Sequence, residues 1–187
     1  MLIEELLFAL FVNRADCYAE QQGKGYLAMK EPVTLELIRQ HLAGSLTLGF
    51  YQLLKDKVKW GCYDFDKDTL EDFENAKLLF TYLLKLGHNP LFEMSGGGDY
   101  RCHIWLFSDT TAAKMQAYLK SICNKTNINP HEVFPKQTIV SDEGYGNLVK
   151  LPFGVNQKTG KRSYFLDSNF DEIKSEEEII KKLMEYI

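Results

Sequence analysis

The sequence predicts an α+β fold, and three features of its middle portion carry this prediction. Short apolar runs with strand character alternate with two longer segments whose apolar residues recur every three to four positions. Turn-forming residues separate the segments. The resulting order, β-α-β-β-α-β, is the split βαβ arrangement. At 187 residues and 45% apolar composition, the chain is long enough for one sizeable core.

The first 55 residues predict a small α/β layer. Residues 1–12, "MLIEELLFALFV", indicate a helix. Thr34 is a suitable N-cap for a second helix over residues 35–43, and Gly44 is a suitable end. Residues 46–54, "LTLGFYQLL", then predict a strand.

The next elements are a strand over residues 58–64 and a long helix. Asp68 or Thr69 caps this helix at its start, and Gly87 with Pro90 closes it. A stripe at helical spacing supplies its buried face: Phe73, Ala76, Phe80 and Leu83.

Two strands and another helix follow. Residues 90–95, "PLFEMS", and 101–108, "RCHIWLFS", predict strands joined by the turn "GGGDY". Thr110 or Thr111 starts a helix, and residues 131–135, "HEVFP", predict a further strand. The aligned apolar residues of that helix are Ala112, Met115, Leu119 and Ile122.

The last segments predict strands over residues 147–154 and 162–167 and an amphipathic helix over 175–187, capped by Ser175. No repeat or sharp linker interrupts the chain. We therefore expect one domain over residues 1–187. It comprises an N-terminal layer (1–55), an RRM-like module (56–170) and a C-terminal helix (171–187).

Composition excludes some classes of protein. Net charge is −4, and residues 167–187 alone carry −4, so the preceding 166 residues are neutral and permit a cationic groove. Four scattered cysteines without a C-x-x-C pair favour reduced thiols over a zinc site. The longest apolar run, residues 6–12, is too short to span a membrane. We expect a cytoplasmic protein.

The segment "WGCYDFDKD" ends a predicted buried strand with Asp64 and Asp66, two residues apart and therefore on one face. Like charges so close repel and need a positive partner. The pair is either two solvated surface residues or a site for Mg²⁺ or Mn²⁺, which prefer oxygen ligands. Glu132 heads a strand that the topology can place beside the first, as a third acid or as an exposed edge residue.

Polar residues in apolar surroundings suggest an anion site. In "SGGGDYRCHIW", glycines precede Arg101 and His103, which share a strand face, so either a phosphate-binding turn or a simple hairpin fits. Residues 23–26, "GKGY", lack P-loop spacing. Further candidates, each also interpretable as an ordinary surface residue, are Lys136, Gln137, Asn147 and Lys150.

Five ordered blocks give the chain a resemblance to the archaeo-eukaryotic primase superfamily, closest to the primase-polymerase domains of CRISPR-associated and TOTE conflict systems. The blocks are "FALFVNRADCYAEQQGKGY", "HLAGSLTLGFYQLLKDKVKWGCYDFD", "EMSGGGDYRCHIWLF", "VFPKQ" and "GYGNLVKLPFG". The resemblance implies that Asp64, Asp66 and Glu132 hold two Mg²⁺ or Mn²⁺ ions. It implies that the NTP or dNTP is bound by residues of the later blocks: Ser95, Gly96, Arg101, His103, Lys136, Gln137, Asn147 and Lys150.

The predicted activity is template-dependent DNA primase-polymerase chemistry by two-metal nucleotidyl transfer. The expected partners are a single-stranded DNA template, a primer, and CRISPR or conflict-system modules, fused or encoded alongside, with no membrane. Three alternatives stay open: a polymerase that only extends primers, a metal-dependent nuclease, and a non-catalytic RRM-like nucleic-acid-binding module.

Overall fold

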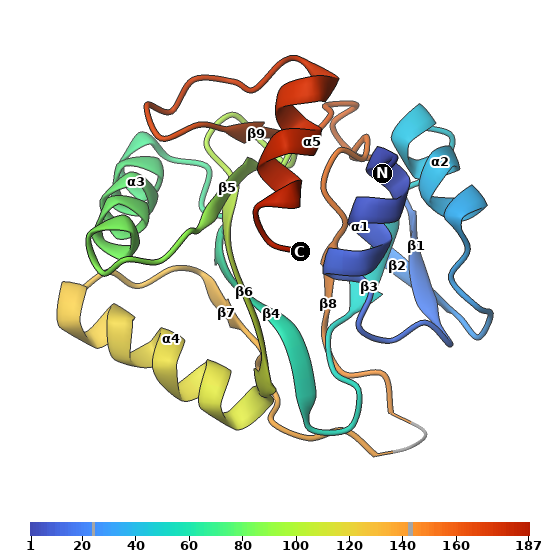
Figure 1. Cartoon of the computed structure of the whole chain (residues 1–187), viewed down its shortest axis with the longest axis horizontal. Coiled ribbons are helices and arrows are strands. Elements are labelled where there is room, and N and C mark those ends of the chain that lie inside the picture. The colour runs from blue at the N-terminus through green and yellow to red at the C-terminus, as the bar shows by residue number, and fades with distance from the viewer. Residues whose placement is uncertain (24, 142–143) are drawn as a thin grey trace.

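The computed structural model describes residues 1–23, 25–141 and 144–187. Its larger sheet confirms the predicted α+β, split βαβ arrangement (Figure 1). The strands lie in the order β7-β4-β6-β5-β9, and each neighbouring pair is antiparallel. Their bounds are β4 (Lys57–Phe65), β5 (Leu91–Met94), β6 (Cys102–Thr111), β7 (Glu132–Phe134) and β9 (Tyr164–Leu166).

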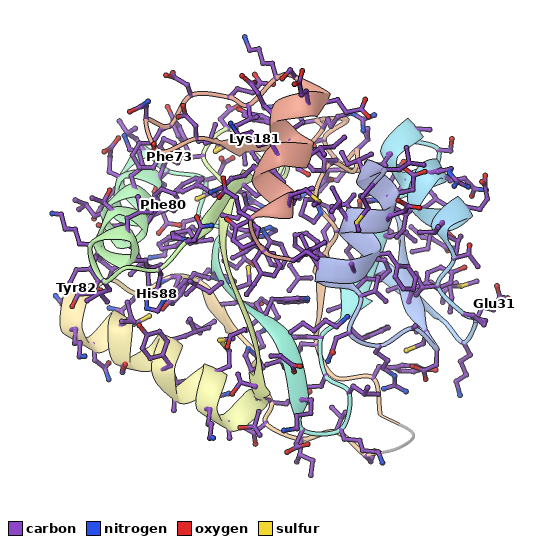
Figure 2. All side chains as sticks on the ribbon, in the orientation of Figure 1. Glu31, Phe73, Phe80, Tyr82, His88 and Lys181 are labelled. Carbon is purple, nitrogen blue, oxygen red and sulfur yellow. The ribbon has the colours of Figure 1, made fainter. Side chains whose placement is uncertain are left out.

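Two helices cover one face of this sheet, α3 (Leu70–Lys85) and α4 (Ala112–Thr126). Phe73 and Phe80, labelled in Figure 2, lie on α3 and meet the ring of Phe92 in edge-to-face contacts, with centroids 5.9 and 5.4 Å away. The apolar stripe predicted for α4 is buried as expected. These contacts make the first of the two larger cores, because aliphatic and aromatic residues of β4, β5 and β6 alternate toward the helices.

A second, four-stranded sheet lies beside the first, in the order β2-β1-β3-β8. Its strands are β1 (Tyr18–Gln22), β2 (Gly25–Met29), β3 (Leu48–Tyr51) and β8 (Leu148–Lys150), accompanied by α1 (Ile3–Phe11) and α2 (Leu35–Ala43). The β1–β2 hairpin was not predicted, because neither "YAEQQ" of β1 nor "GYLAM" of β2 alternates between apolar and polar residues. The sheet is also completed late in the chain, because β8 pairs with β3.

Helix caps agree closely with the predictions. Thr34, Thr69, Thr111 and Ser175 each accept a hydrogen bond from the backbone N–H three residues on. Asp68, the alternative cap of α3, instead accepts a hydrogen bond from the backbone N–H of Tyr100 at 2.8 Å. The C-terminal helix α5 (Glu176–Met184) buries Leu183.

The second core fills the space between the two sheets, together with α1 and α5. It contains Trp60 and Cys62 of β4 and Trp105 of β6, facing Leu48 and Phe50 of β3. Strand alternation therefore sends every second residue of β4 and β6 toward the other sheet. In the part of the chain that the structure describes, none of the helices is both long and apolar enough to cross a bilayer.

Candidate functional site

A polar cavity of about 230 Å³ continues this second core beyond its apolar part. Asp64 follows Trp60 and Cys62 on the same face of β4, and His103 precedes Trp105 on β6, so the lining changes from apolar to charged along each strand. The lining comes from both sheets: Gln21, Tyr26, Asp64, Asp66, Ser95, Gly97, Arg101, His103, Glu132, Phe134, Leu148, Val149, Lys150 and Asn156.

Strand register brings three predicted site residues side by side. Asp64 of β4 lies opposite His103 of β6 on one side and opposite Glu132 of β7 on the other. Asp66 and Arg101 come from the ends of the same two central strands and line the same cavity. As expected from alternation, Cys102 belongs to the core under the helices whereas His103 faces the opposite way.

Each of the three acids already has a cationic partner. Asp66 Oδ1 lies 2.9 Å from Arg101 Nη1, and Asp64 Oδ1 lies 3.6 Å from His103 Nε2. Glu132 forms an ion pair with Lys136, four residues on. The positive charge that the paired aspartates require is thus supplied by side chains of the neighbouring strand.

The charge balance around Asp64 still disfavours its ionised form. Burial raises the pKa of Asp64, and the charges of Asp66 and Glu132 raise it further, although His103 acts in the opposite direction. Burial alone would lower the pKa of His103, but Glu93 and Asp64 outweigh that effect and raise it. The two carboxylates therefore favour the cationic form of His103.

Glu93 is the main residue of this region that sequence reasoning missed. Its carboxylate is fully buried and accepts hydrogen bonds from His103 Nδ1 and Trp105 Nε1, both at 2.9 Å. Burial would raise the pKa of Glu93, but Lys150 and His103 offset that effect, and the pKa lies at about 2. The available signal was an ionisable residue inside the apolar run "PLFEM", since a buried charge requires partners.

Lys150 lines the cavity, but its ammonium group already contacts three acceptors. Its ammonium lies 3.5 Å from Glu93 Oε1, 3.2 Å from the carbonyl of Leu151 and 2.9 Å from Ser163 Oγ. Burial lowers the pKa of Lys150, and Glu93 partly restores it. Each of the three N–H donors of the ammonium therefore has an acceptor. Lys150 contributes a positive charge to the cavity, and not an unused hydrogen-bond donor.

Ser95 lines the cavity, whereas four other predicted residues lie outside the described lining. Gly96 adopts a left-handed backbone (φ 73°), and an added Cβ would lie 2.7 Å from the carbonyl of Lys161, so its role is in the turn. Lys136 pairs with Glu132. The remaining two residues of this group are Gln137 and Asn147.

Residues from the unpredicted hairpin form the opposite wall. Tyr26 of β2 lies over Gly49, where an added Cβ would come within 3.1 Å of its ring. Gln21 Oε1 accepts a hydrogen bond from the backbone N–H of Gln157, which ties β1 to the loop that carries Asn156. Only pairing between distant strands reveals that these residues face the acids, so no local sequence signal was available.

The carboxylates of the cavity are the oxygen ligands that a divalent cation such as Mg²⁺ prefers. Within the described residues, no three His, Cys, Asp or Glu side chains are grouped closely enough to hold a metal ion. Mg²⁺, however, commonly takes only one or two protein carboxylates and completes its shell with water and substrate phosphate. Asp64 and Asp66 fit that requirement, and Glu132 adds a third carboxylate to the same cavity.

A family model matches residues 27–186, and its description is the Archaeo-Eukaryotic Primase domain of the TOTE conflict system. The protein is therefore of the primase/polymerase class of nucleotidyltransferases. Because the match spans most of the chain, the chain belongs to the archaeo-eukaryotic primase domain family of TOTE conflict systems. The resemblance drawn from the sequence blocks is confirmed at this level.

No curated protein matches the chain. Among solved structures, it is similar to the polymerase domain of Mycobacterium tuberculosis Ligase D in complex with DNA. The identity is 10%, the TM-score is 0.45, and the alignment covers 94% of this chain and 72% of the other.

Proposed function

We propose that the protein is a template-dependent DNA primase-polymerase that joins NTPs or dNTPs at the polar cavity. The observation that supports this most directly is the convergence of three carboxylates and two cations from β4, β6 and β7 in one cavity, in a chain of the primase family. In the reaction, the oxygen of a 3′-hydroxyl bonds to the α-phosphorus of the nucleotide. The bond from that phosphorus to the β-phosphate oxygen breaks, pyrophosphate leaves, and the hydroxyl proton passes to solvent.

The carboxylates of Asp64, Asp66 and Glu132 would hold the two Mg²⁺ or Mn²⁺ ions. When bound, such ions acidify the attacking hydroxyl and offset charge on the departing pyrophosphate. Arg101 and His103 would neutralise the triphosphate and hold it in line for attack. To do so, Arg101 exchanges its contact with Asp66 for a phosphate contact, which also leaves Asp66 free as a ligand.

The remaining predicted residues have supporting roles in this proposal. The charge of Lys150 adds to the positive potential at the triphosphate, and Ser95 lies at the cavity edge beside Arg101. Single-stranded DNA template and primer are the proposed partners. We also propose a cytoplasmic location and association with CRISPR or conflict-system modules.

The decisive experiment incubates the protein with single-stranded DNA template, labelled nucleotide and Mn²⁺, with and without primer. Asp64→Asn combined with Asp66→Asn should lower incorporation at least 100-fold, because the bound metal would lose both aspartate ligands. The fold should persist, since the substitution relieves repulsion between the carboxylates. Asp109→Asn, an exposed acid on the same strand as His103, is the matched control and should retain activity.

Each alternative gives a different result in this assay. Product formation only with primer identifies a primer-extending polymerase. Loss of template without nucleotide identifies a nuclease. DNA binding that is indifferent to the double substitution, without pyrophosphate release, identifies a non-catalytic binding module. Any of these three results contradicts the proposal.

A further inference from the structure

One carboxylate behind the cavity belongs neither to the three proposed metal-binding acids nor to the residues proposed to bind the triphosphate. Glu93 of β5 is fully buried, and it is outside the described lining of the cavity. A buried carboxylate is costly unless each oxygen is compensated. The groups that contact the Glu93 carboxylate therefore indicate its role.

Glu93 determines which way the ring of His103 faces. Glu93 Oε2 lies 2.9 Å from His103 Nδ1, and a carboxylate only accepts hydrogen bonds, so Nδ1 carries the hydrogen and donates it. With Nδ1 bound behind the sheet, the other ring nitrogen, Nε2, faces Asp64 at 3.6 Å. A ring turned by 180° about its Cβ–Cγ bond would place Cδ2, which carries no N–H donor, against the Glu93 carboxylate.

The carboxylate is itself held by a rigid group. Trp105 Nε1 donates to the same oxygen, Oε2, at 2.9 Å. The indole is 1% exposed and packs edge-to-face against Phe11 and Trp60, with centroids 5.0 and 4.9 Å away. The position of its N–H is therefore fixed by the core between the sheets.

Glu93 also connects the two sheets. Its second oxygen, Oε1, lies 3.5 Å from Lys150 Nζ, and Lys150 belongs to β8 in the four-stranded sheet. The same ammonium donates to Ser163 Oγ, which in turn accepts from the backbone N–H of Phe153. The buried ion pair between Glu93 and Lys150 thus connects the sheet that carries His103 to the sheet that contains β8.

We propose that Glu93 is a positioning residue, which aims His103 Nε2 into the cavity and ties that orientation, through Lys150, to the opposite sheet. This inference rests on the proposed function, in which His103 meets the triphosphate. Because that contact exists in the bound substrate as well as in the transition state, its loss should appear mainly in KM.

The test compares Glu93→Gln with wild type and with Glu4→Gln in the whole chain. Gln preserves the shape of Glu93 but lacks its charge. Glu4 is a matched control, since it is also a buried acid with one basic partner, Arg39 at 3.0 Å, but lies on α1. The first measurement is the NMR signal of the His103 Nδ1–H, assigned by its absence in His103→Gln. The second is kcat and KM for nucleotide incorporation.

In Glu93→Gln, we expect the His103 signal to disappear or move and KM to rise at least tenfold, with kcat changed less than threefold. Glu4→Gln should match wild type in both measurements. An unchanged His103 signal in folded Glu93→Gln overturns the orienting role. A changed signal with unchanged KM overturns its connection to the nucleotide.

Two further outcomes are separable. If wild type incorporates no nucleotide, the proposed function fails, while the NMR signal still decides whether Glu93 orients the ring. If Glu93→Gln does not fold, Glu93→Gln combined with Lys150→Met removes both buried charges and leaves neither unpaired. The same loss of the His103 signal is then expected, and its persistence overturns the inference.

Discussion

At the scale of single residues, two of the four histidines, His103 and His41, have opposite roles that follow from their surroundings. His103 lies between two carboxylates, which raise its pKa and favour its cationic form. His41 of α2 is fully buried, and both of its ring nitrogens contact backbone groups. Its Nδ1 accepts from the backbone N–H of Leu48 and its Nε2 donates to the carbonyl of Pro152, each at 3.0 Å. The acceptor role of Nδ1 requires the neutral ring, because both nitrogens of a protonated histidine are donors.

This environment predicts acid sensitivity. Burial lowers the pKa of His41 from its ordinary value of 6.5 to about 4, and the charge of Lys150 adds to the effect. Between pH 6.5 and about 4, His41 is therefore protonated in the unfolded chain but neutral in the folded chain. The stabilisation is complete above pH 6.5 and is lost as pH falls from 6.5 through about 4.

We expect wild type to lose roughly 2–3 kcal/mol more unfolding free energy than His41→Gln between pH 7.5 and pH 4.5. Urea unfolding of both proteins at the two pH values measures this difference. The comparison concerns the change with pH, so a lower stability of the variant at both pH values does not affect it. Parallel pH dependence of the two proteins would contradict the assignment.

At the scale of secondary-structure elements, the structure depends on close contacts that local patterns do not show. The turn that follows β8 reaches α2 because Gly154 has no side chain. An added Cβ would lie 2.1 Å from His41 Cε1 and 2.7 Å from its Nε2. The ring cannot withdraw, since both of its nitrogens are hydrogen-bonded.

Gly154→Ala should therefore destabilise the protein by about 3 kcal/mol through overpacking. Gly25→Ala is the matched control, because its added Cβ would have no heavy atom within 4 Å, and it should change stability by less than about 0.5 kcal/mol. Chemical denaturation measures both. Equal stability of the two variants would show that α2 and the turn can separate without cost.

At the scale of the whole molecule, one core joins segments from both ends of the chain. Leu183 of α5 is fully buried in the same cluster as Phe11 of α1, Phe50 of β3 and Trp105 of β6. The C-terminal helix therefore stabilises the space between the sheets, and the cavity lies in that same space. This arrangement predicts that both sheets and α5 unfold together.

Leu183→Ala should lower the unfolding free energy by about 2–5 kcal/mol, whereas Met184→Ala, which is 47% exposed, should lower it by less than about 0.5 kcal/mol. Tryptophan fluorescence and far-ultraviolet circular dichroism should give coincident transitions in each case. Separate transitions would show that residues 171–187 unfold independently of the sheets.

The predictions from sequence succeeded where the determining forces are local. Helix caps depend on one side chain and a backbone group three residues away, and all four threonine and serine caps were found as expected. The split βαβ order followed from periodicity and turn residues. Alternation along β4 and β6 also correctly set Asp64 and His103 on one face of the sheet.

Local patterns failed where partners come from distant segments. The β1–β2 hairpin has no alternating pattern of its own and is placed by the pairing of β1 with β3, so the sequence did not predict it. Glu93 was overlooked because its partners lie on β6 and β8.

By itself, the sequence determined the order of the elements apart from the β1–β2 hairpin, the face of β4 and β6 that carries charged residues, and the family to which the chain belongs. Only the tertiary structure decided that the cavity has two walls from different sheets, that each acid has a basic side chain beside it, and that Glu93 contacts both His103 and Lys150. The physical reason is that periodicity reports which side of a strand faces inward, whereas hydrogen bonds and ion pairs form between residues that only the complete fold brings within reach.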